Sequence, residues 1–248
     1  MTNRAEMKPF LLDEMAKPYL EYDMIIKYTS IPRYVDYRAR LLYAFLSLGS
    51  PTFAKQHEVV SLATSLVQIG LDIHDGIDDK PIHGEDANDE RKRQLRILAG
   101  DYYSARFYQL LAKIGQIQLI NKISDAISEV NRLKLDIYMH AKSVKLSLHE
   151  QIEAKVKVRK PLFLVFSDLL QDSFKSIYPM ALHRLTTCEV ILEMMQSEEY
   201  ESKDKDKFVA MFKVEWSQLN QLLSVSPFRL IQDEVEKIRL QMQGTITI

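Results

Sequence analysis

The residues best suited to chemistry are the acidic ones that end a long apolar segment. Four carboxylates lie close together: Asp72, Asp75, Asp78 and Asp79. Like charges repel each other and resist burial, so carboxylates gather mainly where a cation is held. On a helix, Asp72, Asp75 and Asp79 share one face because they lie three and four residues apart. Two carboxylates one turn apart can clamp Mg²⁺, and the alternative is a solvated helix end beside a loop.

A second segment, Ile97 to Arg106, adds information because it follows the acidic one in order. It reads Ile-Leu-Ala-Gly-Asp-Tyr-Tyr-Ser-Ala-Arg, and His74 stands directly before Asp75. This combination resembles the trans-prenyl diphosphate synthase family, in which a His precedes an aspartate-rich DDxxD motif and a Leu-x-Gly-Asp helix follows. The resemblance is best from His57 to Leu111 and fades after Pro161.

The resemblance assigns roles to particular residues. Four of them occupy family motif positions: His74, Asp78, Gly100 and Asp101. The implied fold is an all-α, single-domain helical bundle of the isoprenoid synthase type. The implied sites are a Mg²⁺ site at Asp75 and Asp79, and a tunnel for the growing prenyl chain at Val67, Gly70 and Leu71. Close packing of helices is the alternative role for Gly70.

The departures from the family pattern concern the charged groups that handle diphosphate. Gly76 stands where the family has its second Asp, and the Arg-Arg-Gly that normally follows is replaced by residues 80–84. The second DDxxD motif is absent, because the helix expected to carry it offers only Glu189 and Glu193. Ionising an allylic diphosphate requires Mg²⁺ held from both sides of the departing pyrophosphate. The isolated chain is therefore predicted to be inactive.

Chains that are degenerate in this way resemble the small subunits of heterodimeric heptaprenyl or hexaprenyl diphosphate synthases of Gram-positive bacteria. The resemblance implies a large catalytic subunit that carries both aspartate-rich motifs and most of the Mg²⁺. The complex would take allylic and isopentenyl diphosphates and supply the menaquinone side chain, with six or seven isoprene units left open. The helix that ends in Asp75, with its neighbours, would contact the partner through an apolar surface. Asp75 and Asp79 would then be the remnant of a metal site.

Two other functions remain open at this point. The first is a Mg²⁺-dependent prenyltransferase that is active alone and uses Asp72, Asp75 and Asp79. The second is a non-catalytic protein that binds a prenyl lipid or a partner helix. Replacing Asp75 and Asp79 by Ala would abolish activity in the first case and have only a modest effect on a heterodimer.

Composition narrows the class of protein. The chain has 248 residues, 46% of them hydrophobic and 27% charged, with a formal net charge of -1. These values are typical of a globular protein and give no reason to expect nucleic-acid binding. The single cysteine, Cys188, excludes an internal disulfide and fits a reducing compartment. With no apolar signal segment at the N-terminus and no apolar run near 20 residues, we expect a cytoplasmic chain without a membrane span.

The scarcity of glycine favours helices over sheets, because tight hairpin turns usually need it. No glycine occurs between Gly115 and Gly244. Apolar residues recur at spacings of three and four, which predicts helices at 37–48, 57–75, 93–114, 120–137, 161–174, 182–196, 207–223 and 227–243. Gly115 is expected to cap the third of these, and 80–90 and 197–207 to be connectors. The chain is expected to be one domain, with residues 1–30 as a candidate for a loosely attached segment.

Overall fold

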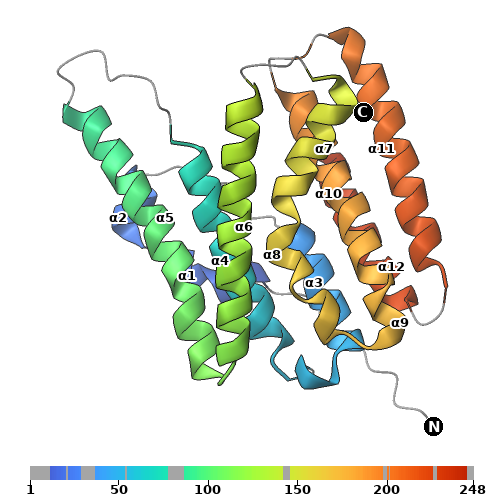
Figure 1. The fold of residues 1–248 in the computed structure, drawn as a ribbon, viewed down its shortest axis with the longest axis horizontal. Coiled ribbons are helices and arrows are strands. Elements are labelled where there is room, and N and C mark those ends of the chain that lie inside the picture. Colours follow the sequence, from blue (N-terminus) through green and yellow to red (C-terminus); the bar gives the residue numbers. More distant parts are fainter. Residues whose placement is uncertain are drawn as a thin grey trace.

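Long α-helices lie side by side around one apolar core (Figure 1). This computed structural model describes residues 12–20, 22–28, 37–53, 55–77, 87–141, 146–197, 200, 202–225 and 228–244, and none of them is in a strand. The elements are α1 (Leu12–Leu20), α2 (Asp23–Tyr28), α3 (Tyr37–Gly49), η1 (Pro51–Phe53), α4 (His57–Asp75), α5 (Ala87–Lys113), α6 (Ile117–Ala141), α7 (Leu148–Arg159), α8 (Pro161–Leu164), η2 (Ser167–Leu169), α9 (Asp172–Lys175), α10 (Ile177–Gln196), α11 (Ser202–Leu223) and α12 (Arg229–Gly244). The all-α prediction is confirmed. Among the described residues, no helix combines the length and apolar character needed to cross a membrane.

Helix α4 occupies the centre of the fold because it is apolar on nearly every face. All residues from Val60 to Leu71 are buried. The helix packs along α5 on one side and along α3 on another. A helix that is hydrophobic all round can remove its side chains from water only inside a core. The predicted bounds of this helix agree with the observed ones, so the sequence places the start of the acidic stretch correctly at its C-terminal end.

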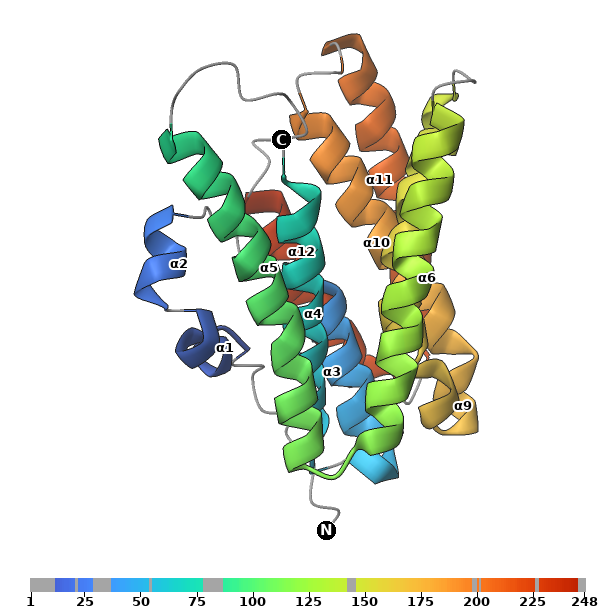
Figure 2. The same cartoon turned by 60° about the vertical axis from the view of Figure 1, so that its left-hand side comes forward.

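The turn between α5 and α6 brings the end of α5 beside the start of α6 (Figure 2). Gly115 has a φ of 74°, which is unfavourable for residues with a side chain. Its N–H donates to the Ala112 carbonyl at 3.0 Å, and the Gln116 N–H donates to the Leu111 carbonyl at 2.8 Å. This pair of bonds is the Schellman arrangement that ends many helices. The predicted cap at Gly115 is confirmed.

Helix α7 was not among the predicted helices, although its start carries a clear signal. The Ser147 side chain accepts a hydrogen bond from the Glu150 N–H, and the Glu150 side chain accepts one from the Ser147 N–H. This capping box fixes the first turn of the helix. The helix lacks a strong apolar stripe, since its buried residues are Ile152 and Val156, and periodicity alone therefore misses it.

The single helix predicted at 161–174 is wrong. The chain forms three short pieces instead: α8, η2 and α9. Leu170 and Gln171 are extended, and the Gln171 N–H donates to the Gly49 carbonyl at 2.7 Å. Phe174 then packs so tightly on Gly49 that a Cβ there would lie 2.6 Å from its ring. Contacts with the end of α3 therefore override the helical pattern.

Two connectors are shorter than predicted. Helix α5 begins at Ala87, within the loop expected at 80–90, and α11 begins at Ser202, within the connector expected at 197–207. The extra first turns of α5 and α11 are rich in charged residues. Most charged residues are compatible with an exposed helical turn. Charge by itself is therefore a poor sign of a loop in this chain.

The described part of the N-terminal segment packs on the bundle. Helix α1 contacts α4, and α2 contacts α5, as Figure 2 shows. Ala16 and Ile25 are buried. The Tyr103 hydroxyl donates to the Leu20 carbonyl at 3.2 Å, and burial raises the pKa of this phenol to about 12. These contacts anchor both short helices to the bundle, while the division into domains stays a prediction.

Candidate functional site

The residues at the family motif positions meet where α4 ends beside α5. A Cβ on Gly100 would lie 2.6 Å from Nε2 of His74, so the imidazole ring lies directly on the glycine. The same Nε2 is 3.3 Å from Oδ1 of Asp101. Three of the four motif residues therefore form one local contact that joins the two helices. The fourth, Asp78, lies outside the described residues.

The glycine proposed for a tunnel is used in helix packing. A Cβ on Gly70 would lie 2.8 Å from the Gly100 carbonyl oxygen and 2.9 Å from Cβ of Ser104. Val67 and Leu71 are buried in the same helix. The space beside Gly70 is therefore occupied by the backbone of α5. A tunnel role for Val67, Gly70 and Leu71 stays a prediction.

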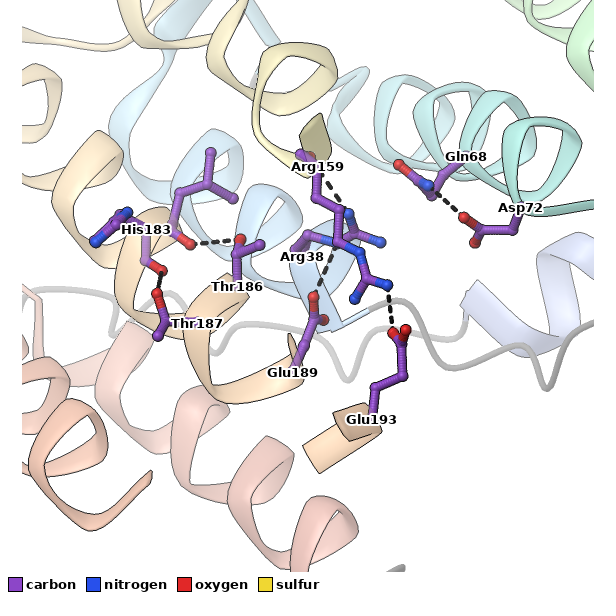
Figure 3. Close-up of polar contacts among 10 residues, drawn as sticks. Arg38, Gln68, Asp72, Arg159, His183, Thr186, Thr187, Glu189 and Glu193 are labelled. Carbon is purple, nitrogen blue, oxygen red and sulfur yellow. Dashed lines mark hydrogen bonds and ion pairs between the residues drawn. The ribbon is translucent and has the colours of Figure 1, made fainter. Parts of the chain in front are cut away.

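The carboxylates of the expected metal site already have partners within the chain. Oδ1 of Asp75 is 2.6 Å from Nζ of Lys134, which comes from α6. Asp72 accepts a hydrogen bond of 2.7 Å from the Gln68 side chain, one turn earlier on α4 (Figure 3). Asp79, the other predicted ligand, lies outside the described residues.

A cleft of about 1070 Å³ opens beside this end of α4. Its walls come from α4, α6, α7 and α10, and the lining residues are His74, Asp75, Ile77, Asn131, Lys134, Leu135, Ile137, Tyr138, Lys155, Val158, Arg159 and Glu193. The two acidic positions of interest, Asp75 and Glu193, thus line one cavity. The family resemblance leads one to expect acidic motifs on these same helices, α4 and α10, although α10 offers only Glu189 and Glu193.

The α10 wall also carries its own cations. Glu193 pairs with Arg159, and its carboxylate is 3.5 Å from Nζ of Lys155. Burial alone would raise the pKa of Glu193, but Arg159 and Lys155 outweigh burial and hold the pKa below its usual value. The carboxylate is therefore ionised and neutralised by α7. A divalent cation would have to displace these basic groups.

A second ion pair lies deeper on α10. Nε of Arg38 is 3.0 Å from Glu189, and the two side chains are only 8% and 10% exposed. Nη1 of Arg38 donates to the Arg159 carbonyl at 3.3 Å, and its guanidinium lies 5.1 Å from the centre of the Phe163 ring. Figure 3 shows Arg38 and Arg159 facing the two glutamates. The pairs connect α3, α7 and α10.

These contacts decide what the cleft can do chemically. Within the described residues, no three or more His, Cys, Asp or Glu side chains lie close enough together to hold a metal ion. Mg²⁺ needs several oxygen ligands, and the carboxylates here are engaged by Lys134, Arg159 and Arg38. The described residues therefore do not fit this cofactor, and no catalytic step on this chain is assigned to it. A weak remnant role of Asp75 and Asp79 stays a prediction.

Sequence reasoning found the acidic members of these pairs but not the basic ones. Lys134, Arg159 and Arg38 are ordinary helix residues in the sequence. Their partners lie 59, 34 and 151 positions away, at Asp75, Glu193 and Glu189. A single sequence carries no signal for pairs so far apart.

Solved structures resemble this arrangement of helices. The crystal structure of geranylgeranyl pyrophosphate synthetase from Pyrococcus horikoshii matches with a TM-score of 0.54 and 14% sequence identity. The match covers 95% of this chain and 87% of that one. At this level of identity the likeness concerns the fold alone, and it confirms the isoprenoid synthase fold.

Sequence comparison is more specific. Heptaprenyl diphosphate synthase component 1 from Geobacillus stearothermophilus is 39% identical over 90 residues, which is 36% of this chain and 38% of that protein. The aligned part thus spans less than half the length of this curated relative. A family model described as heptaprenyl diphosphate synthase (HEPPP synthase) subunit 1 matches residues 22–237. By this match over most of its length, the chain belongs to the heptaprenyl diphosphate synthase subunit 1 family.

Proposed function

We propose that this chain is the non-catalytic subunit of a heterodimeric long-chain polyprenyl diphosphate synthase. The complex would extend farnesyl diphosphate with isopentenyl diphosphate to an all-trans heptaprenyl chain for menaquinone. The partner would be a large subunit that carries both aspartate-rich motifs, the Mg²⁺ and the diphosphates. The observation that carries the proposal is that the carboxylates on both walls of the cleft, Asp75 and Glu193, are paired with Lys134 and Arg159.

The pairing bears on catalysis through the charge of the leaving group. A departing pyrophosphate is highly negative and is stabilised by metal ions held on carboxylates. Here the carboxylates of Asp75 and Glu193 are neutralised by Lys134 and Arg159, which are fixed parts of the same protein. A metal ion at either carboxylate would have to compete with these cations, which already balance the charge of that carboxylate. A scaffold role explains why the fold persists without the metal sites.

A surface for the partner is available on α5 and α6. These adjacent helices expose several large apolar side chains: Ile97, Leu98, Tyr108, Ile117, Leu135, Tyr138 and Met139. Figure 2 shows the two helices meeting at the turn that joins them and diverging from there. Large exposed apolar residues are common at protein interfaces, and two of these, Leu135 and Tyr138, also line the cleft. The family and its curated relative are named as one subunit or component, which supports a partner of this kind.

Reconstitution tests the proposal directly. The purified chain and a large subunit are incubated separately and together with farnesyl diphosphate, isopentenyl diphosphate and Mg²⁺. We expect long-chain product only from the mixture, because only the large subunit would hold metal on both sides of the leaving group. Long-chain product from this chain alone would overturn the proposal. So would full activity of the large subunit without it.

A further inference from the structure

A second cavity lies far from the acidic stretch along the chain, where α10, α11 and α12 meet. Its volume is about 390 Å³, and it is lined by Leu192, Met195, Val209, Phe212, Lys213, Trp216, Ser217, Asn220 and Arg239. We call it the α11 pocket. Pockets that bind small molecules have volumes of about 300–1,000 Å³, so this one is large enough for a ligand of modest size. It shares no lining residue with the cleft at the end of α4.

One side of the α11 pocket is apolar and flat. Leu192 and Met195 of α10 face the pocket, together with Phe212 and Trp216 of α11. The rings of Phe212 and Trp216 are 5.9 Å apart between centroids and only 10° from parallel. Parallel rings one helical turn apart form a smooth surface, which suits a linear hydrocarbon chain better than a branched or globular group.

The other side of the pocket is polar and cationic. Lys213, Ser217 and Asn220 lie four and three residues apart on α11, so they follow one another along one stripe of that helix. Arg239 joins them from α12, where Nε donates to the Glu236 carboxylate at 2.9 Å and 3.0 Å. The ionisable residues that line the pocket, Lys213 and Arg239, are both basic. Arg239 is paired with the Glu236 carboxylate, so the net positive charge of this side comes from Lys213, and it favours an anion over a cation.

A buried donor supplies an independent observation. Trp216 is 6% exposed, and its indole N–H has no hydrogen-bond partner among the described residues. Buried polar groups are normally hydrogen-bonded, and an unpaired one lowers stability. The ring of Trp216 lines the pocket, but the indole nitrogen itself is covered, so a ligand's acceptor oxygen would reach this N–H only by displacing the atoms that cover it.

We propose that the α11 pocket binds a small amphiphilic anion. Its linear apolar chain packs between Leu192 and the rings of Phe212 and Trp216. Its anionic head, a phosphate or a carboxylate, meets Lys213 and Arg239. This site is separate from the chemistry of the cleft, so it does not depend on the proposed subunit role.

The chain reports on this site by its own fluorescence, because Trp216 is its only tryptophan. The full chain is titrated with octyl phosphate below the concentration at which it forms micelles. Octanoate tests the other head group, and 1-octanol carries the same chain without charge. We expect a saturable change in tryptophan emission with at least one of the two anions and much weaker binding of the alcohol. Equal binding of 1-octanol, or no saturable response to either anion, would overturn the proposal.

Two lysine variants test the place of binding. Lys213→Gln removes the cation at the pocket and is expected to raise Kd roughly tenfold, which corresponds to one charge-assisted hydrogen bond. Lys205→Gln removes the same charge from an exposed position of α11 outside the pocket and is expected to leave Kd unchanged. Circular dichroism confirms that both variants are folded. Equal weakening by the two substitutions would mean that general charge drives binding, and the proposed site would be wrong.

Discussion

At the scale of single residues, the small residues of the family motif serve helix packing, and Asp75 is paired with a lysine. A side chain at position 100 would clash with the His74 ring, and one at position 70 would clash with the backbone of α5. Asp75 is present, with Lys134 at 2.6 Å. The same motif therefore serves helix packing and internal ion pairing.

Substituting Gly70 distinguishes a role in helix packing from a role in lining a tunnel. Gly70→Ala places a Cβ 2.8 Å from a backbone oxygen that cannot move aside, so we expect a loss of about 1–3 kcal/mol in the free energy of unfolding. Gly76→Ala is the control, since the atoms nearest to its added Cβ, the carbonyl oxygens of Asp72 and Ile73, would be 3.6 Å away. Thermal unfolding of both variants measures the effect. An unchanged melting temperature for Gly70→Ala, with a shift in product length, would instead support the tunnel.

Substituting Asp75 tests whether this carboxylate holds a metal ion. The Asp75 and Lys134 pair is partly exposed, and such pairs contribute about 0–1 kcal/mol. Asp75→Asn is therefore expected to change the rate of the reconstituted synthase less than about fivefold. The rate is measured at saturating Mg²⁺, with Asp125→Asn on exposed α6 as the matched control. A drop of 100-fold or more would mean that Asp75 still holds metal.

At the scale of elements, the ends of helices are read more reliably from local chemistry than from periodicity. The Gly115 turn and the Ser147–Glu150 capping box both determine where helices end or begin. The periodic segment at 161–174 breaks because Gln171 bonds to the end of α3. Local caps act over a few residues and can be recognised in a sequence, whereas a tertiary hydrogen bond cannot.

The contact between α7 and α10 should depend on pH through His183. Burial lowers the pKa of this imidazole, and so does Lys160, whose Nζ is 3.2 Å from Nδ1. The folded state thus binds a proton less readily than the unfolded state, whose value is near 6.5. Its contribution to stability is present above that pH and is lost as the pH falls below it.

Denaturant titrations from pH 7.5 to pH 5 measure this dependence. As the pH is lowered, we expect the free energy of unfolding to decrease in the wild type and to decrease less in His183→Gln. His149→Gln, at an exposed position of α7, provides the control and should retain the full dependence. The same slope in His183→Gln and the wild type would assign the effect to other groups.

At the scale of the whole molecule, the sequence predicts the fold better than the site. The central helix at 57–75 and the all-α class follow from apolar residues and scarce glycine. The ion pairs do not follow, because Arg38 and Glu189 are brought together only when α3 packs against α10. Three-dimensional neighbours thus change the interpretation of the acidic residues from a cation site to a set of internal pairs.

The partner surface gives a prediction at the same scale. Leu98 on α5 is 61% exposed, so Leu98→Glu should leave the chain folded and weaken binding of the large subunit by roughly tenfold or more. Val214→Glu on α11, where the valine is 53% exposed, is the matched control and should bind normally. Calorimetric titration with the large subunit measures both. Equal affinities for the two variants would place the interface elsewhere.

The pairing of Glu189 with Arg38 also constrains how this lineage can evolve. Removing one partner of a buried ion pair leaves an uncompensated charge, which costs about 3–5 kcal/mol. Changing Arg38 first would strand the glutamate, and changing Glu189 first would strand the arginine. Replacing this ion pair by metal ligands on α10 therefore needs at least two substitutions. Whichever comes first, the chain with one substitution is less stable. Under the proposed subunit role, this pair would oppose a return to catalysis and would preserve dependence on a partner.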